Sequence, residues 1–278
     1  MKNKILVTLL MSFLLVDCGP DGKYTYSEAE SYIMYESEVN FESSTTIKSL
    51  DVDWLAGEVH IEEGTYFAIQ EEVMNNGNYY PLYYRVQDER LTLKFVKSGT
   101  NQADLANSGK KLTVTVPSSF EELNLNIAAG LLTVQAANIN RINLQSAAGI
   151  NNVELNNNES FKASVAAGSL YLKTENAKDV SFDVSAGNGE FHTRTVENVT
   201  SNISAGALKL TILDSSKINT ITCSLSIGNA TMDYDGVRGY YLSKNGKIST
   251  VEGSDQSKEK FHINSSITLG DIHINSLS

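Results

Sequence analysis

The sequence predicts an all-β protein: a right-handed parallel β-solenoid of about 19-residue coils, preceded by an irregular N-terminal β segment. The first observation is that glycines stand 19 residues apart at positions 130, 149, 168, 187 and 206. The second is that each of these glycines follows Ala-Ala or Ser-Ala. The third is that apolar residues recur at every second position on both sides of them, the period of a strand with one buried face. A fixed period of this kind is typical of repeat architectures.

Each repeat reads as two short strands and two turns. In the first regular repeat the apolar positions are Leu123, Leu125 and Ile127 before the glycine, and Leu132 and Val134 after it. One coil cannot bury this face alone, so consecutive coils are expected to stack with their backbones paired in parallel. The usual chirality of crossover connections favours the right-handed form.

The glycine marks one corner of each coil, where a residue without a Cβ permits a tight turn. The regular repeats cover residues 120–214, and the pattern extends on both sides of them. The other turn carries a polar column in which Asn138, Asn157 and Asn176 are equivalent and can hydrogen-bond from coil to coil. The predicted corners are Gly57, Gly130, Gly149, Gly168, Gly187, Gly206, Gly228 and Gly270.

The N-terminus has the features of an export signal. Lys2 and Lys4 precede an apolar run at 5–16, which is short for a bilayer span and fits the apolar region of a signal peptide. The end of this run and the residues after it, Leu-Val-Asp-Cys-Gly at 15–19, resemble a bacterial lipoprotein box, although Asp17 stands where that pattern has a small residue. The resemblance implies cleavage before Cys18 and lipidation of that cysteine, which would anchor the protein in a membrane.

These features divide the chain into three parts. We expect a lipoprotein-type signal peptide at 1–17, a tether at 18–46 and a β-solenoid domain at 47–278. The tether is rich in Ser, Glu and Tyr, and its tyrosines could instead pack on the first coil. The predicted location is extracytoplasmic, at the cell envelope and attached to the membrane.

Composition excludes several functions. The formal net charge of -11 over 278 residues argues against nucleic-acid binding, which rests on Lys and Arg neutralising phosphates. Two cysteines are too few for a disulfide framework. The four histidines, His60, His192, His262 and His273, are far apart in sequence, so no metal site is expected. No sequence motif for a cofactor or a catalytic nucleophile is present.

The chain also resembles a known family. The stretch from Leu50 to Ile61, an Arg-Leu-Thr-Leu strand at 90–93, the Leu-Thr-Val-Thr-Val-Pro strand ending at Pro117 and the Ala-Gly repeats are similar to the putative-adhesin family of bacterial envelope β-strand-repeat proteins. The resemblance covers roughly residues 39–278. It implies a surface location, repetitive β structure and a binding or scaffolding role, and it brings no catalytic residues.

Tyrosines form the best candidate binding surface. Tyr79, Tyr80, Tyr83 and Tyr84 follow a polar loop at 75–78. Exposed tyrosines offer rigid contact area with a polar tip, which suits a polysaccharide or a protein surface. The alternative is that these residues cap the end of the solenoid and are half-buried.

We therefore expect a non-enzymatic, adhesin-like envelope lipoprotein that binds or scaffolds. Two alternatives stay open. A polysaccharide-acting β-helix enzyme would need carboxylates that converge on one face, whereas the acids in this sequence look scattered. A self-assembling envelope element would need long, apolar and uncapped terminal coils.

Overall fold

The structure is a computed structural model that describes residues 22–36, 39–40, 47–74, 79–105, 108–118, 120–235, 237–245, 247–252 and 260–277. The predicted signal peptide and Cys18 lie outside these residues.

The prediction of an all-β chain is confirmed. The elements are β1 (Lys23–Tyr24), η1 (Ala29–Ser31), β2 (Ile33–Met34), β3 (Val39–Asn40), β4 (Ser49–Gly64), β5 (Ala68–Val73), β6 (Tyr83–Gln87), β7 (Arg90–Lys94), β8 (Thr100–Asn101), α2 (Gln102–Leu105), β9 (Lys110–Pro117), β10 (Glu122–Asn138), β11 (Arg141–Ile212), η2 (Ser215–Lys217), β12 (Thr220–Tyr234), β13 (Tyr240–Lys244), β14 (Lys247–Glu252) and β15 (Phe261–Ser276).

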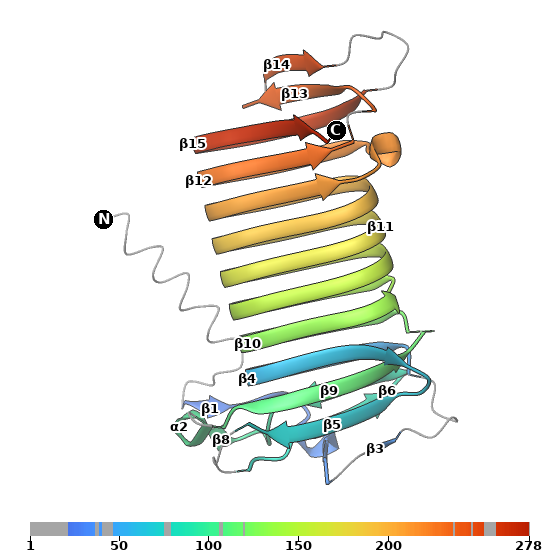
Figure 1. The fold of residues 1–278 in the computed structure, drawn as a ribbon. Coiled ribbons are helices and arrows are strands. Elements are labelled where there is room, and N and C mark those ends of the chain that lie inside the picture. Colours follow the sequence, from blue (N-terminus) through green and yellow to red (C-terminus); the bar gives the residue numbers. More distant parts are fainter. Residues whose placement is uncertain are drawn as a thin grey trace.

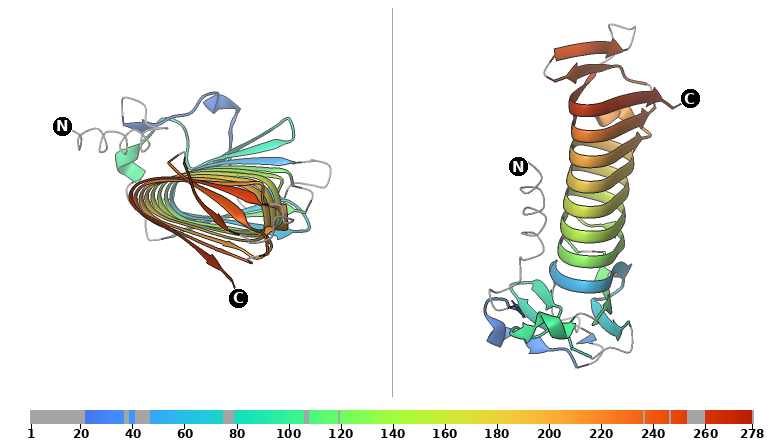
Figure 2. Two further views of the ribbon diagram at one scale, coloured as in Figure 1. Left: turned by 90° about the horizontal axis from the view of Figure 1, so that it is seen from above. Right: turned by 90° about the vertical axis from the view of Figure 1, so that its left-hand side faces the viewer.

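The body of the molecule is a stack of windings of the chain (Figure 1). Strand β11 alone has 72 residues, and a straight strand at about 3.3 Å per residue would be far longer than any domain, so it winds back over itself. We call each winding a rung, with a first arm before its corner glycine and a second arm after it. Seen from above, the rungs superimpose as a flattened ring (Figure 2). Rungs 1 to 8 have their corners at Gly57, Gly130, Gly149, Gly168, Gly187, Gly206, Gly228 and Gly270.

Neighbouring rungs pair in parallel and in register. Gly130 pairs with Gly57 on one side and Gly149 on the other, and Gly228 pairs with Gly206 and Gly270. A shift by one residue would turn every apolar side chain outward, so the alternation of the sequence fixes this register. The inward positions on both arms form a continuous buried core that runs through the stack.

The corner glycines are required by two independent constraints. Their φ angles lie between 108° and 148°, a region that residues with a side chain rarely adopt. A Cβ on Gly187 would also lie well under 3.0 Å from the carbonyl oxygen of Gly168, and the same holds along the column. A glycine at each corner is therefore required for neighbouring rungs to stack as well as for the chain to turn.

The predicted asparagine column is confirmed at the opposite turn. The Asn157 side-chain amide donates to Asn138 Oδ1 at 2.6 Å, and Asn176 donates to Asn157 Oδ1 at 3.0 Å. Thr195 continues the column by donating to Asn176 Oδ1 at 2.8 Å. Asp214 leaves the column, because its carboxylate accepts from the Ser216 amide and caps η2 in the longer turn between rungs 6 and 7.

The end of the stack below rung 1 is covered by a region that we call the cap, made of the described residues in 22–36 and 66–120 (Figure 1). Strand β7 pairs in parallel with the first arm of rung 1, and β9 pairs in parallel with the second arm. Strands β6 and β5 then pair antiparallel with β7 and β9. The sheet is therefore mixed, because Asp88 and Glu89, both with positive φ, turn β6 back onto β7 as a tight hairpin.

Part of the predicted tether belongs to this cap. Tyr24 and Tyr35 are buried, and the Tyr35 hydroxyl donates to the Ile69 carbonyl oxygen at 2.7 Å. These two tyrosines therefore pack within the cap, whereas the alternative to a tether had placed them on the first coil.

A buried ion pair joins the cap to rung 1. Lys110 Nζ lies 2.5 Å from Glu71 Oε1, and both side chains are fully enclosed. The Lys110 ammonium also donates to the carbonyl oxygens of Tyr80 and Phe95. Burial lowers the pKa of Lys110 to about 8, against the opposing effect of Glu71. Trp54, a buried inward residue of rung 1, packs edge to face against Phe95 at this point.

The other end of the stack is only half covered. Strand β13 pairs in parallel with the first arm of rung 8, and β14 pairs antiparallel with β13. Within the described ranges, the second arm of β15 pairs with β12 alone. Ile272 and Ile274 of this arm are only partly buried, whereas Ala230 and Met232 one rung below are fully buried.

Candidate functional site

The candidate site is a polar hollow of about 460 Å³ on the outer face of the first arms, next to the cap. We call it the groove. Its floor comes from β7 and from rungs 1, 2 and 3, and its wall includes Tyr32 and Arg85 of the cap. The residues that line it and face outward are Tyr32, Asp51, Asp53, Arg85, Arg90, Thr92, Lys94, Asn124, Asn126, Asn143 and Gln145.

One column of the floor is a ladder of amides that ends on a carboxylate. Asn143 donates to Asn124 Oδ1 at 2.8 Å, and Asn124 donates to Asp51 Oδ1 at 2.7 Å. These residues occupy the same position in successive rungs, three residues before the inward residue that precedes the corner. The stacking distance of the rungs therefore sets the spacing of the polar groups.

Charged side chains lie in the columns on both sides of this ladder. Lys94 Nζ contacts Asp53, and Asn126 donates to Asp53 Oδ1 at 3.2 Å. Arg90 bridges Asp51 at 2.6 Å and Glu122 at 3.3 Å. Hydrogen bonds from Asn124 and contacts with Arg141 and Arg90 lower the pKa of Glu122, so this carboxylate is held ionised.

The wall is aromatic and cationic. The rings of Tyr26 and Tyr32 meet edge to face with centroids 4.9 Å apart. The Arg85 guanidinium lies 4.8 Å from the centroid of Tyr32 and pairs with Glu28. Burial raises the pKa of Tyr26 to about 12, so its hydroxyl stays protonated beside Lys94.

The predicted tyrosines do not form one exposed platform. Tyr79 is 54% exposed, and its hydroxyl donates to Glu71 Oε2 at 3.1 Å, on the side of the buried ion pair. Tyr80 and Tyr84 are partly buried against the core. Tyr83 pairs across the strands with Lys94, which lines the groove. Strand alternation explains this division, because adjacent residues in β6 point to opposite faces.

Cys223 and the four histidines lie outside the groove. Cys223 is buried at an inward position, and burial raises the pKa of its thiol. His60 and His192 each contact a glutamate two residues earlier on their own strand. His262 and His273 are exposed on rung 8. In the described part of the chain, no group of three or more His, Cys, Asp or Glu side chains could hold a metal ion.

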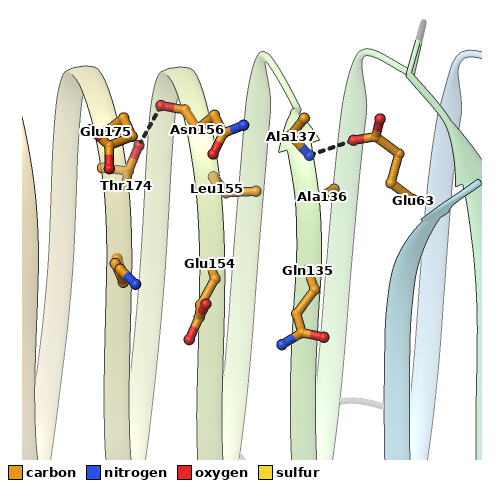
Figure 3. Close-up of a pocket in the computed structure, with 10 residues that line it drawn as sticks. Glu63, Gln135, Ala136, Ala137, Glu154, Leu155, Asn156, Thr174 and Glu175 are labelled. Carbon is orange, nitrogen blue, oxygen red and sulfur yellow. Dashed lines mark hydrogen bonds between the residues drawn. The ribbon is translucent and has the colours of Figure 1, made fainter.

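A second hollow, of about 330 Å³, lies at the turn after the second arms of rungs 1 to 4 (Figure 3). It brings together Glu63, Glu154 and Glu175, a grouping that the scattered acids of the sequence did not predict. Glu63 accepts a hydrogen bond from the Ala137 amide at 2.5 Å. Glu175 accepts from Arg194 Nε at 3.2 Å. Two of the three carboxylates are therefore engaged in holding the turns together.

Comparisons with known proteins give a fold but no family. No family model and no curated protein matches the chain. Among solved structures, it is similar to a putative adhesin from Bacteroides fragilis NCTC 9343, at 12% identity over 88% of this chain and 96% of that one, with a TM-score of 0.50. Another is a putative adhesin from Parabacteroides merdae, at 14% identity, 87% and 95% coverage and a TM-score of 0.43. A putative lipid binding protein from Parabacteroides distasonis follows, at 12% identity, 88% and 98% coverage and a TM-score of 0.42.

At these identities the likeness to the Bacteroides fragilis protein shows a shared all-β fold. None of the helices among the described residues has the length and apolar character needed to cross a membrane.

Sequence reasoning missed most of the groove. Asp51, Asp53, Arg90 and Lys94 alternate with apolar residues, which is a usable signal that they share one face. Their pairing across β4 and β7 depends on a register that joins segments about 40 residues apart, and no repeat links those segments. Tyr32 was expected in the tether, so no sequence pattern predicted its contact with Arg85.

Proposed function

We propose that this chain is an adhesin-like binding protein of the bacterial cell envelope, with the body a parallel β-solenoid that presents the groove as its binding site. The observation that carries the proposal is the groove itself. It joins Tyr32 and Arg85 of the cap to polar columns on three successive rungs. Binding sites are typically concave and contain a few convergent polar groups on a rigid frame. Parallel ladders on both sides of rungs 1 and 2 supply that rigidity.

Anchorage to the membrane through Cys18 is part of the proposal. It is supported by the apolar run at 5–16 and by the cysteine that follows it, and Asp17 is the residue that departs from the pattern. Mass spectrometry of the membrane-fraction protein, beside a Cys18→Ala variant, tests this. A lipidated N-terminal cysteine that is lost in the variant supports the anchor. An unmodified cysteine in the wild-type protein removes it and leaves a secreted or signal-anchored form.

We also propose that the protein is not an enzyme. The engaged carboxylates of the second hollow support this, because a general acid or base must be available to the substrate. The coverage of rung 1 by the cap, and of the first arm of rung 8 by β13, disfavours end-to-end assembly. Release of reducing ends from incubated envelope polysaccharides would contradict the non-enzymatic assignment.

Adhesion of cells that display the chain tests the role of the groove. Cells with the wild-type protein and cells with Tyr32→Ala are compared for attachment to envelope-coated and mucin-coated surfaces, at equal surface amounts of protein. The matched control is Tyr66→Ala, since Tyr66 is 60% exposed on the cap and does not line the groove. We expect attachment to be lost in the Tyr32 variant only. Equal attachment of all three proteins would contradict the groove as the adhesive site.

A further inference from the structure

We infer that the groove binds an uncharged oligosaccharide that lies along the axis of the stack, an inference that rests on the proposed binding function and specifies its ligand. The first step concerns charge. All five charged side chains that line the groove are already in ion pairs: Asp51 with Arg90, Asp53 with Lys94, and Arg85 with Glu28. An ionic ligand would have to displace one of these partners, and the displaced charge would lose its compensation.

The second step concerns the hydrogen-bonding groups. Sugar hydroxyls both donate and accept, so they are matched by side chains that also do both. Asn124, Asn126, Asn143 and Gln145 are carboxamides of this kind, and they occupy four outward positions on rungs 2 and 3. Asn126 and Asn143 each donate one hydrogen bond to the rung below, which leaves each amide a second N–H group and acceptor capacity on its oxygen. Asn124 donates to both Asp51 and Glu122, so its remaining capacity is that of its side-chain oxygen as an acceptor. A chain of hydroxyls can use that capacity without breaking the ladder.

The third step concerns shape and apolar surface. The groove runs over four stacked strands, from β7 through rungs 1 and 2 to rung 3. At about 4.8 Å between strands this is about 14 Å, which accommodates a short oligosaccharide rather than a single sugar. Tyr32 supplies aromatic surface at the cap side, held by Tyr26 and Arg85. An aromatic ring suits the apolar face of a sugar, while the rest of the lining suits its hydroxyls.

The same lining does not suit a protein partner. Protein interfaces are anchored by buried aromatic and aliphatic side chains that fill pockets on the other surface. The outward residues of the groove are polar or charged apart from Tyr32. The overall charge of -11 likewise disfavours nucleic acid.

Calorimetric titration of the full chain in detergent tests the inference. The neutral probes are maltohexaose, cellohexaose and N-acetylchitohexaose, and the charged probes are hexagalacturonate and a heparin hexasaccharide. Variant Asn126→Ala has a matched control in Asn202→Ala: Asn202 occupies the same position on rung 6, and its amide donates to Asp183 one rung below as Asn126 donates to Asp53. We expect at least one neutral probe to bind, Asn126→Ala and Tyr32→Ala to weaken it by about tenfold, and Asn202→Ala to leave it unchanged.

The outcomes separate this inference from the proposed function. Binding of the charged probes alone would overturn the neutral-glycan inference and leave a binding groove. Binding of no probe, together with loss of adhesion in Tyr32→Ala, would overturn the glycan class and keep the function. Equal weakening by Asn126→Ala and Asn202→Ala would also overturn the inference, because the effect would then be one of stability. If Tyr32→Ala changes neither adhesion nor probe binding, both fail.

Discussion

The rungs and the cap both bury apolar strands, but they do so with contacts of different kinds. In the rungs one contact is repeated: Asn157 to Asn138 and Asn198 to Asp179 both join side chains 19 residues apart. In the cap each contact occurs once, as between Lys110 and Glu71 or between Arg85 and Glu28, which are 57 residues apart. Repeated contacts spread stability along the stack, whereas single contacts concentrate it at one place.

This difference has a physical reason at the end of the stack. The backbone hydrogen-bonding groups of an inner rung pair with another rung on each side, but rung 1 has no rung below it. The cap must cover both arms with strands that come from separate segments, β7 and β9, and must fill the space below Trp54. Covering a strand edge removes the unpaired backbone groups that promote aggregation. The groove forms where this irregular cover meets the first regular rungs.

The largest expected effect comes from a side chain at a corner glycine. Gly187→Ala places a Cβ against the carbonyl oxygen of Gly168 and adds strain at a φ of 138°. Backbone cannot move there without opening the stack, so we expect a loss of about 5 kcal/mol or more in the free energy of unfolding. Urea denaturation measures it.

The cap offers a control for this effect. Gly99 also has a positive φ, of 91°, but a Cβ there would meet nothing within 4 Å. Gly99→Ala should therefore lose only about 1 kcal/mol, from backbone strain alone. Similar losses in the two variants would show that strain, and not stacking, explains the glycine column.

A second large effect is expected at the ion pair of the cap. Lys110→Met leaves the Glu71 carboxylate buried without its cation, and breaking such a pair costs about 3–5 kcal/mol. Hydrogen exchange should show faster exchange in β5 and β9 than in rungs 3 to 6. The double variant Lys110→Met, Glu71→Leu should recover most of the loss, because no uncompensated charge remains. If the double variant is as unstable as the single one, the pair is not the cause.

The same lysine predicts a dependence on pH. Its folded pKa of about 8 lies below its ordinary value of 10.5, so the unfolded chain binds more protons between these values. Stability therefore rises with pH in this window, and at pH 8 and below the full penalty of a buried ammonium is present. We expect the wild-type protein to gain about 1–2 kcal/mol over Lys110→Met between pH 8 and 10. The comparison stops at pH 10, because Tyr26 and Tyr79 have folded pKa values of about 12 against an ordinary value of 10. Above pH 10 the folded chain therefore binds more protons at these tyrosines than the unfolded chain, and stability falls as the pH rises. Parallel stability curves for the two proteins would contradict this.

The regular part of the fold could be predicted because its contacts are periodic. The corner glycines and the asparagine column were found from spacing alone, and in the structure they stack rung on rung. Asp88 and Glu89 are also a local turn signal in the sequence, and they form the hairpin between β6 and β7. The antiparallel pairing of β5 with β9 and the burial of Lys110 were not predicted. A lysine without a visible partner in the sequence is normally at the surface, so no sequence pattern predicts that Lys110 is buried.

The candidate site shows the same limit. Half of the groove lies on repeat positions such as Asn124 and Asn143, whose outward direction follows from alternation. The other half, Tyr32 and Arg85, is brought there by long-range packing of the cap. No spacing links these residues, so the site becomes visible only when the cap is placed on the rungs.

The smallest predicted effect concerns the asparagine column. Asn157→Ala removes two side-chain bonds, one given to Asn138 and one accepted from Asn176. All three residues are exposed, so water replaces most of what is lost, and we expect about 1 kcal/mol with an unchanged dependence on urea concentration. Asn188→Ala, an exposed asparagine beside a corner, should have almost no effect. Equal losses in the two variants would mean that the hydrogen bonds of the column add no stability beyond the general cost of replacing an exposed asparagine with alanine. A loss confined to Asn157 would show that even exposed contacts stabilise the rungs when they are repeated.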